Sequence, residues 1–263
     1  MIYKKGCDII DPHFPESEIL DFPKTAEEVR LMEEAIHAAK QAEVVVMVLG
    51  GNELTVREDR SRTSLNLPGR QEELLKAVCA TGKPVILVML DGRASSINYA
   101  AAHVPAILHA WFPGEFCGQA VAEALFGDYN PGGRLAVTFP KSVGQIPFAF
   151  PFKPGSDESS STSVYGALYP FGHGLSYTTF TYSDLHISPS HQGVQGDIHI
   201  SCKIKNRTCR SNPDHKATHT GSIPFPRYCN KLFVYVIPWN CCTGQIIDQI
   251  QENQMYTHHR KEW

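Results

Sequence analysis

The sequence VVVMVLGG, residues 44–51, decides the fold. It is a continuous, mostly β-branched run that ends in two glycines, which is typical of a strand buried on both faces of a parallel sheet. Residues 25–43 precede it with apolar side chains at helical spacing. Thr25 is placed as an N-cap, with Glu28 three residues later as in a capping box. Together the two segments predict a helix followed by a buried strand.

The same alternation continues along the chain. Further helices are predicted over residues 67–83, 95–104 and 115–134, and further strands over 84–92, 106–114 and 135–142. Strands that alternate with helices of this length indicate βα units. The predicted fold class is therefore α/β, a doubly wound, mostly parallel sheet in an α/β sandwich. Residues 196–206 alternate in polarity and predict the start of a β-sandwich, a truncated one in this chain.

Composition narrows the possible partners. The chain has 263 residues, a formal net charge of -3 and 42% hydrophobic residues, which is ordinary globular composition. It has no basic stripe, so nucleic acid is not expected as a partner. It also has no apolar run of the roughly 20 residues that a membrane span needs, so no membrane is expected. The first residues lack the apolar core of a secretory signal, and localisation stays open.

Residues 207–263 give conflicting local signals. Cysteine, histidine and proline are concentrated there, and only KLFVYVI, residues 231–237, resembles a strand. The spacing argues against a metal site, since zinc ligands come at tight intervals and the adjacent Cys241 and Cys242 do not suit one tetrahedral ion. The residues considered and rejected for this role are Cys202, Cys209, His215, His219, Cys229, Cys241 and Cys242. The segment is interpreted as an irregular tail, either out of frame or disordered.

Four motifs resemble the C-terminal part of glycoside hydrolase family 3, the β-glucosidases and β-xylosidases. They are FPG, GDYNPGGRL, GQIP and YPFGHGLSYT, which occur in that order at family-like spacing. The resemblance implies a (β/α)8 barrel, then an α/β sandwich, then a fibronectin type III-like domain. It places the α/β sandwich at residues 1–180, incomplete at its N-terminus, the start of the fibronectin-like domain at 181–206, and the tail at 207–263.

The resemblance also implies a mechanism. Family members are retaining glycosidases, in which one carboxylate attacks the anomeric carbon and a second carboxyl group acts first as acid and then as base. The nucleophile belongs to the barrel, which is expected upstream, so this chain alone is expected to be inactive or nearly so. The implied substrate is an oligosaccharide ending in β-linked glucose or xylose, and no cofactor or metal is implied. Relatives are often periplasmic or secreted.

The resemblance places the acid/base on the charged loop that follows residues 44–51. Glu58 is the predicted acid/base, because many family members carry a glutamate four residues before the Arg-Thr pair that precedes L-x-LPG. Glu53 is the alternative, since loop lengths vary. Arg62, Asn52 and Glu53 are predicted to bind substrate.

The loop also contains arginines that bear on this prediction. A proton donor must hold its proton near neutral pH. Arg57, Arg60 and Arg62 would oppose this unless they point elsewhere. Asp59 is the weaker acid candidate, because the family pattern centres on glutamate.

Other conspicuous residues are predicted to serve structure. Trp111 and Phe112 offer aromatic faces that suit a sugar ring, but a core position under the FPG turn is favoured. Asp91 and Arg93 lie at another strand end, where a hydrogen bond that stabilises the loop is expected.

Two other functions are considered. The chain is alternatively a non-catalytic carbohydrate-binding module, or one that completes the active site of a separate barrel. Nucleotide binding is disfavoured, because no G-x-G-x-x-G or P-loop pattern occurs and the loop is acidic.

Overall fold

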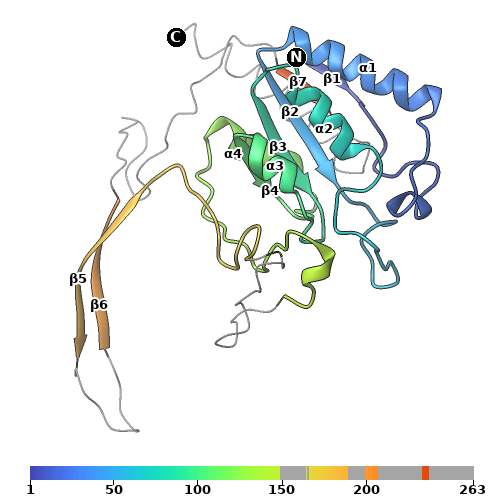
Figure 1. Ribbon diagram of the computed structural model, residues 1–263. Helices are drawn as coiled ribbons and strands as arrows, with labels where there is room; N and C mark the ends of the chain where they lie inside the picture. The colour runs from blue at the N-terminus through green and yellow to red at the C-terminus, as the bar shows by residue number, and fades with distance from the viewer. Residues whose placement is uncertain (149–163, 165, 189–198, 207–232, 237–263) are drawn as a thin grey trace, which may run out of the picture. The chain divides into compact units, whose positions relative to one another are not determined.

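The structure is a computed structural model that describes residues 1–148, 164, 166–188, 199–206 and 233–236 (Figure 1). The chain divides into two compact units. One contains the parallel sheet and its helices α1 to α3. The other contains residues 123–133 and the strand pair β5–β6. Within the described residues, no helix has the length and apolar character that crossing a bilayer requires.

A five-stranded parallel sheet forms the centre of the first unit. Its spatial order is β1-β7-β2-β3-β4, and every neighbouring pair is parallel. The strands are β1 (Ile2–Lys4), β2 (Val44–Gly50), β3 (Val85–Leu90), β4 (Ala106–His109) and β7 (Phe233–Val236).

Three helices connect the strands. They are α1 (Ala26–Gln41), α2 (Gln71–Cys79) and α3 (Asn98–His103). The chain passes from β1 to β2, β3 and β4 in one direction across the sheet, so crossovers of the usual right hand place all three helices on one face. Accordingly, α1 packs against α2 and α2 against α3 (Figure 1). A fourth helix, α4 (Cys117–Phe126), follows β4 and ends at Gly127, whose φ of 79° closes it.

The predicted capping box forms at the start of α1. The Thr25 hydroxyl accepts a hydrogen bond from the Glu28 amide at 3.2 Å, and the Glu28 carboxylate accepts one from the Thr25 amide at 2.7 Å. Two backbone donors that the helix leaves free are thereby satisfied, which fixes where the helix begins.

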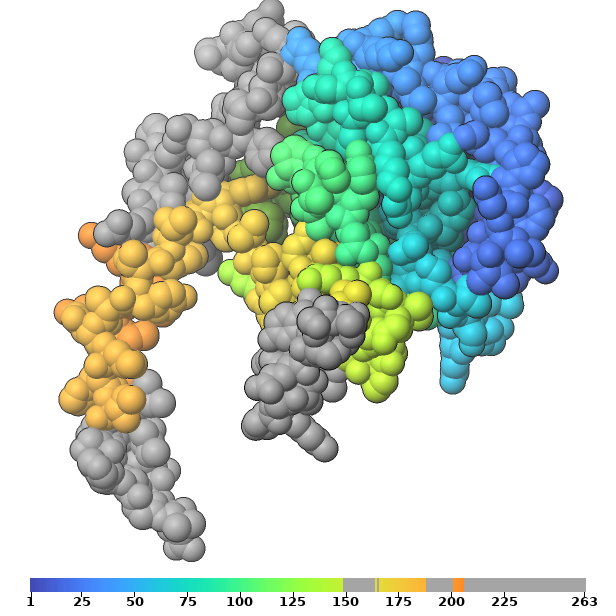
Figure 2. Space-filling view, viewed as in Figure 1, coloured from blue at the N-terminus to red at the C-terminus, as the bar shows by residue number. Residues whose placement is uncertain are grey.

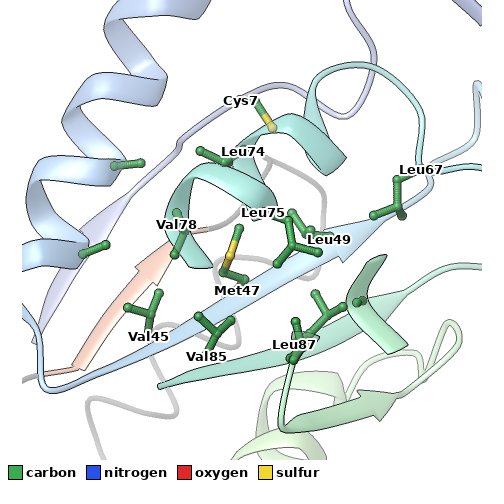
Figure 3. Packing of buried hydrophobic residues seen from close by; sticks show 14 of the residues in the cluster. Cys7, Val45, Met47, Leu49, Leu67, Leu74, Leu75, Val78, Val85 and Leu87 are labelled. Carbon is green, nitrogen blue, oxygen red and sulfur yellow. The ribbon is translucent and has the colours of Figure 1, made fainter. Parts of the chain in front are cut away.

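Both faces of β2 are buried. Its odd-numbered side chains pack under α2 in one hydrophobic cluster, which contains Val45, Met47, Leu49, Leu74, Leu75 and Val78 (Figure 3). On the opposite face, Val44, Val46 and Val48 are at most 4% exposed. This confirms the α/β sandwich with a parallel sheet that the apolar run predicted.

The predicted strand over residues 135–142 is wrong. The segment forms only an isolated antiparallel bridge between Phe139 and Tyr169. Hydrogen bonds also join Leu135 to His173 and to Gly172. The proline after Phe139 has no amide hydrogen to continue a ladder, which explains why the apolar alternation does not become a strand.

The second unit contains an antiparallel strand pair, in the region where the sequence predicts the start of a truncated β-sandwich. β5 (Phe180–Ser188) pairs with β6 (His199–Asn206), and the register shifts between Ser183 and His186. Ahead of β5, the Asn130 side chain accepts hydrogen bonds from the Tyr177 amide at 2.8 Å and the Ser176 hydroxyl at 2.9 Å. Asn130 therefore joins the turn after α4 to the segment that leads into β5.

The strand β7 lies between β1 and β2. It lies within residues 231–237, the strand-like segment of the predicted tail, and residues 207–232 and 237–263 lie outside the described residues. Val234 is in register with both Ile2 and Val45. Since β1 and β2 do not pair with each other, β7 is what joins β1 to the sheet.

Proline at Tyr235 tests this placement, because it removes a backbone N–H from an interior strand. We expect Tyr235→Pro to lower the free energy of unfolding by roughly 3 kcal/mol. The measurement is urea unfolding followed by tryptophan fluorescence. The control is Tyr235→Val, which keeps the N–H. A urea midpoint equal for the proline and valine variants would show that β7 is not part of the sheet.

Candidate functional site

The charged loop connects β2 to α2 at the carboxyl ends of the parallel strands. Ligands of open α/β sheets bind at this edge. The loop comprises residues 51–70, follows the end of β2 in Figure 1, and its cyan residues project from the surface in Figure 2.

Gln71 ties the two ends of this loop together. Its side chain is fully buried. The amide oxygen accepts a hydrogen bond from Gly50 N at 2.8 Å, and the amide nitrogen donates to Gly50 O at 2.8 Å and to Pro68 O and Ile9 O, both at 3.1 Å. A buried amide with every polar atom satisfied holds the base of the loop closed.

Glycine at position 50 is required where the chain leaves β2. Its φ is 148°, and a Cβ there would lie 2.0 Å from Leu90 O of the neighbouring strand. The close approach lets β2 and β3 stay paired up to their last residues.

Asn52 shapes the first turn of the loop. Its side-chain oxygen accepts a hydrogen bond from Leu54 N at 3.0 Å, and its backbone N–H donates to the buried Thr55 hydroxyl at 2.9 Å. These are the bonds of an Asx-type turn. Glu53, between them, is exposed.

Arg93 holds the middle of the loop from the adjacent strand end. Its guanidinium donates to Thr55 O at 3.0 Å and to Arg60 O. Asp91 is buried beside it and accepts hydrogen bonds from the Ser95 hydroxyl at 2.5 Å and from Arg93 N at 3.2 Å. The loop-stabilising hydrogen bonds expected of Asp91 and Arg93 are thus present.

Burial raises the pKa of Asp91. The hydrogen bonds from Ser95 and Arg93 act against this rise, as do the positive charges of Arg62 and Arg93. Through its hydrogen bonds with Ser95 and Arg93, the carboxyl group is part of the network that holds the loop.

Arg62 is paired with a residue outside the loop. Its side chain is 5% exposed and forms an ion pair with Glu18, which is 6% exposed. A side chain that was predicted to bind substrate is thus held inside the first unit.

The apex of the loop consists of Arg57, Glu58 and Asp59. These residues are exposed and line an open depression of about 480 Å³. Asp59 forms ion pairs with Arg57 at 3.3 Å and Arg60 at 3.9 Å. Glu58 makes no hydrogen bond or ion pair with the residues that the structure describes.

Arg57, Arg60 and Arg62 therefore bind carboxylates other than Glu58. Arg57 and Arg60 pair with Asp59, and Arg62 pairs with Glu18. None of these three arginines is paired with Glu58 in the structure.

Aromatic rings gather beyond the end of β4. The Trp111 ring lies 4.3 Å from His109 and 6.0 Å from Phe139, measured between centroids, and its backbone φ is 56°. Phe112 is 49% exposed and lies against Gly92. Trp111 is thus packed among other rings, as favoured from the sequence, while Phe112 faces solvent.

No metal centre is present among the described residues, where no three histidine, cysteine, aspartate or glutamate side chains are grouped to hold an ion. Of the cysteines and histidines considered for metal binding, only Cys202 in β6 belongs to the described part of the chain, and it is an exposed free cysteine.

Two anchors of the loop, Gln71 and Glu18, were not predicted. Gln71 had a signal, because it lies in helical phase with the buried Leu74, Leu75 and Val78, where a polar side chain needs a partner. Glu18 had none, since it precedes Arg62 by 44 residues and no spacing rule connects them.

Comparison with known proteins identifies the family of these elements. The family model for the glycosyl hydrolase family 3 C-terminal domain matches residues 12–177. A periplasmic β-glucosidase of Salmonella typhimurium is 38% identical over 226 residues, which are 78% of this chain and 29% of that relative. A β-xylosidase of Formosa agariphila is 41% identical over 208 residues, 78% of this chain and 27% of the relative.

Solved structures agree. A β-glucosidase from Erythrobacter marinus superposes with a TM-score of 0.68 and 38% identity, over 78% of this chain and 29% of its own. A Listeria innocua β-glucosidase in complex with glucose gives a TM-score of 0.61 and 30% identity, over 70% of this chain and 27% of its own. The chain therefore spans less than a third of the length of these relatives.

The buried His109 predicts a pH dependence of stability. Burial lowers the pKa of His109 from 6.5 to about 4, and neither ring nitrogen has a hydrogen-bond partner among the described residues. The unfolded chain binds a proton at His109 more readily than the folded chain does. The contribution of neutral His109 to the free energy of unfolding is therefore complete above pH 6.5 and is lost as the pH falls toward 4. Between pH 7.5 and 4.5 the loss is roughly 2 kcal/mol.

The measurement is urea unfolding at both pH values. His109→Phe keeps a ring against Trp111 and should remove most of this pH dependence, whereas the exposed His103→Phe should retain it. An equal pH dependence in wild type and His109→Phe would contradict the assignment to His109.

Proposed function

Because the chain belongs to glycoside hydrolase family 3, we propose that it is the portion of a retaining β-glycosidase that supplies the acid/base. The proposed substrate is an oligosaccharide ending in β-linked glucose or xylose, a choice supported by relatives named β-glucosidase and β-xylosidase. The nucleophile is proposed to come from a (β/α)8 barrel that precedes this portion, and the chain alone is proposed to be inactive.

Glu58 is the proposed acid/base, and its exposed position at the loop apex is the observation that carries the proposal. An acid/base carboxyl must reach the glycosidic oxygen of a bound sugar. The apex gives that access, while Gln71 and Arg93 hold the two sides of the loop. The pairing of Arg57 and Arg60 with Asp59 supports the same role, because it leaves Glu58 without a competing ion pair.

The proposed reaction has two steps. In the first, Glu58 donates its proton to the leaving oxygen while the barrel carboxylate attacks the anomeric carbon and the glycosidic bond breaks. In the second, the Glu58 carboxylate takes a proton from water, the water oxygen bonds to the anomeric carbon, and the barrel carboxylate is released.

The other predicted residues have two proposed roles. Glu53 is the proposed sugar contact, because its side chain is exposed on the same loop. Asn52 and Arg62 are proposed to affect substrate binding through the shape of the loop, since Asn52 forms its first turn and Arg62 is 5% exposed.

The test uses a chimera in which this chain replaces the matching portion of the Salmonella typhimurium β-glucosidase. We expect Glu58→Gln to lower kcat for an alkyl β-glucoside about 100- to 10,000-fold, because a poor leaving group needs the proton. An aryl glucoside with an acidic phenol needs little protonation and should lose far less in the first step.

Glu53→Gln is the matched control on the same loop. The large loss with Glu53→Gln and not with Glu58→Gln would transfer the acid/base role to Glu53. Full activity in both variants would favour the alternative of a non-catalytic carbohydrate-binding or complementing module.

A further inference from the structure

A buried carboxylate outside the loop binds its second half. Glu18 is the last residue of the short helix η1 (Glu16–Glu18), which precedes α1. One of its oxygens accepts a hydrogen bond from Arg62 Nε, and the other accepts from the Thr63 amide and the Thr63 hydroxyl, both at 2.9 Å. Both oxygens of Glu18 are therefore engaged by two consecutive residues of the loop.

The rest of the Arg62 guanidinium is also enclosed. Its Nη2 donates to Asn66 O at 3.1 Å, and its central carbon lies 5.9 Å from the ring centre of Phe14. Planar guanidinium groups suit such combined pairing and stacking. With Arg62 and Glu18 nearly fully buried, either charge without the other would be strongly unfavourable.

The anchor lies close in sequence to the apex. Arg62 follows Glu58 by four residues, and Arg60, between them, is fixed through its carbonyl by Arg93. The path from the apex to the anchor is thus short and is held at two points.

We propose that Glu18 is a positioning residue for Glu58, an inference that rests on the proposed function of Glu58. Glu18 holds residues 62–63 in place and so limits where the apex can move. It also binds a guanidinium that would otherwise be free to pair with Glu58. The pair Glu18–Arg62 thus sets both the position and the charge environment of the acid/base.

Limited digestion of the full chain with trypsin tests the anchor. Trypsin must bind the arginine side chain before it cleaves, so the buried Arg62 should be cut slowly in wild type. Glu18→Gln keeps the shape but removes the charge that holds Arg62. We expect cleavage after Arg62 to become on the order of 10- to 100-fold faster, as the loop opens locally.

Two variants isolate the charge of Glu18. Glu16→Gln, in the same turn of η1 but exposed, should leave cleavage after Arg62 at the wild-type rate. Glu18→Asp keeps the negative charge and should restore most of the slow cleavage, which a neutral side chain of the native length does not.

Cleavage after Arg93 distinguishes positioning from general stability, because Arg93 lies on the neighbouring loop. The proposal expects a faster cut after Arg62, an unchanged cut after Arg93 and a lowered urea midpoint in Glu18→Gln, because a buried charge loses its partner. It is overturned if Glu18→Gln behaves like Glu16→Gln, or if the cuts after Arg62 and Arg93 accelerate by the same factor.

Kinetics in the chimera test the positioning itself: Glu18→Gln should lower kcat for the alkyl glucoside about 10-fold with little change in KM, whereas Glu16→Gln should leave both unchanged. An unchanged kcat in Glu18→Gln would overturn the positioning role. The digestion, in contrast, does not depend on the chemistry of Glu58. An unchanged pattern in Glu18→Gln would overturn the positioning role whatever Glu58 does. Full activity of Glu58→Gln in the chimera would instead overturn the proposed function, with the digestion result unaffected.

Discussion

The burial of β2 on both faces is the constraint on which the rest of the first unit depends. A strand without access to water must pair its backbone groups with neighbouring strands. β3 does this on one side and β7 on the other. Because β2 runs to the edge of the sheet before the chain turns at Gly50, the charged loop begins at a fixed point, and Gln71 returns the chain to the same point.

The charged side chains in and around the loop differ in burial. The pair Arg62–Glu18 is buried, Asp91 lies under the loop in a hydrogen-bonded network, and Asp59 engages arginines at the surface. Buried charges need partners, whereas exposed pairs contribute little to stability. An exposed carboxylate without a partner can therefore serve chemistry without weakening the fold, and on this loop both Glu58 and Glu53 are exposed and have no partner among the described residues.

Local patterns predicted the elements that depend on local physics. The helix α1 and its capping box at Thr25 followed from spacing alone, and the apolar run of β2 predicted a parallel sheet. Residues 135–142 were predicted wrongly as a strand. Phe139 forms a single bridge to the distant Tyr169, and Pro140, which follows it, cannot continue a ladder of hydrogen bonds. The position of β7 and the Glu18–Arg62 pair depend on contacts between distant residues, which no periodicity in the sequence encodes.

The residues of the site were also predictable to different degrees. The family resemblance predicted the loop and the glutamate at its apex, whereas the partners of the arginines required coordinates. Sequence placed Arg57, Arg60 and Arg62 near Glu58 but gave no direction to their side chains. Their pairing with Asp59 and Glu18, and not with Glu58, is what the structure adds.

Rescue by azide tests the central claim most directly. In the chimera with Glu58→Ala, an aryl glucoside with an acidic phenol can still form the glycosyl-enzyme, but water then lacks its general base. Azide is an anionic nucleophile that needs no proton removed. The account predicts that azide raises kcat about tenfold or more and yields β-glucosyl azide, while Glu53→Ala shows no such response. No azide response in Glu58→Ala, or a response in Glu53→Ala alone, would contradict the account.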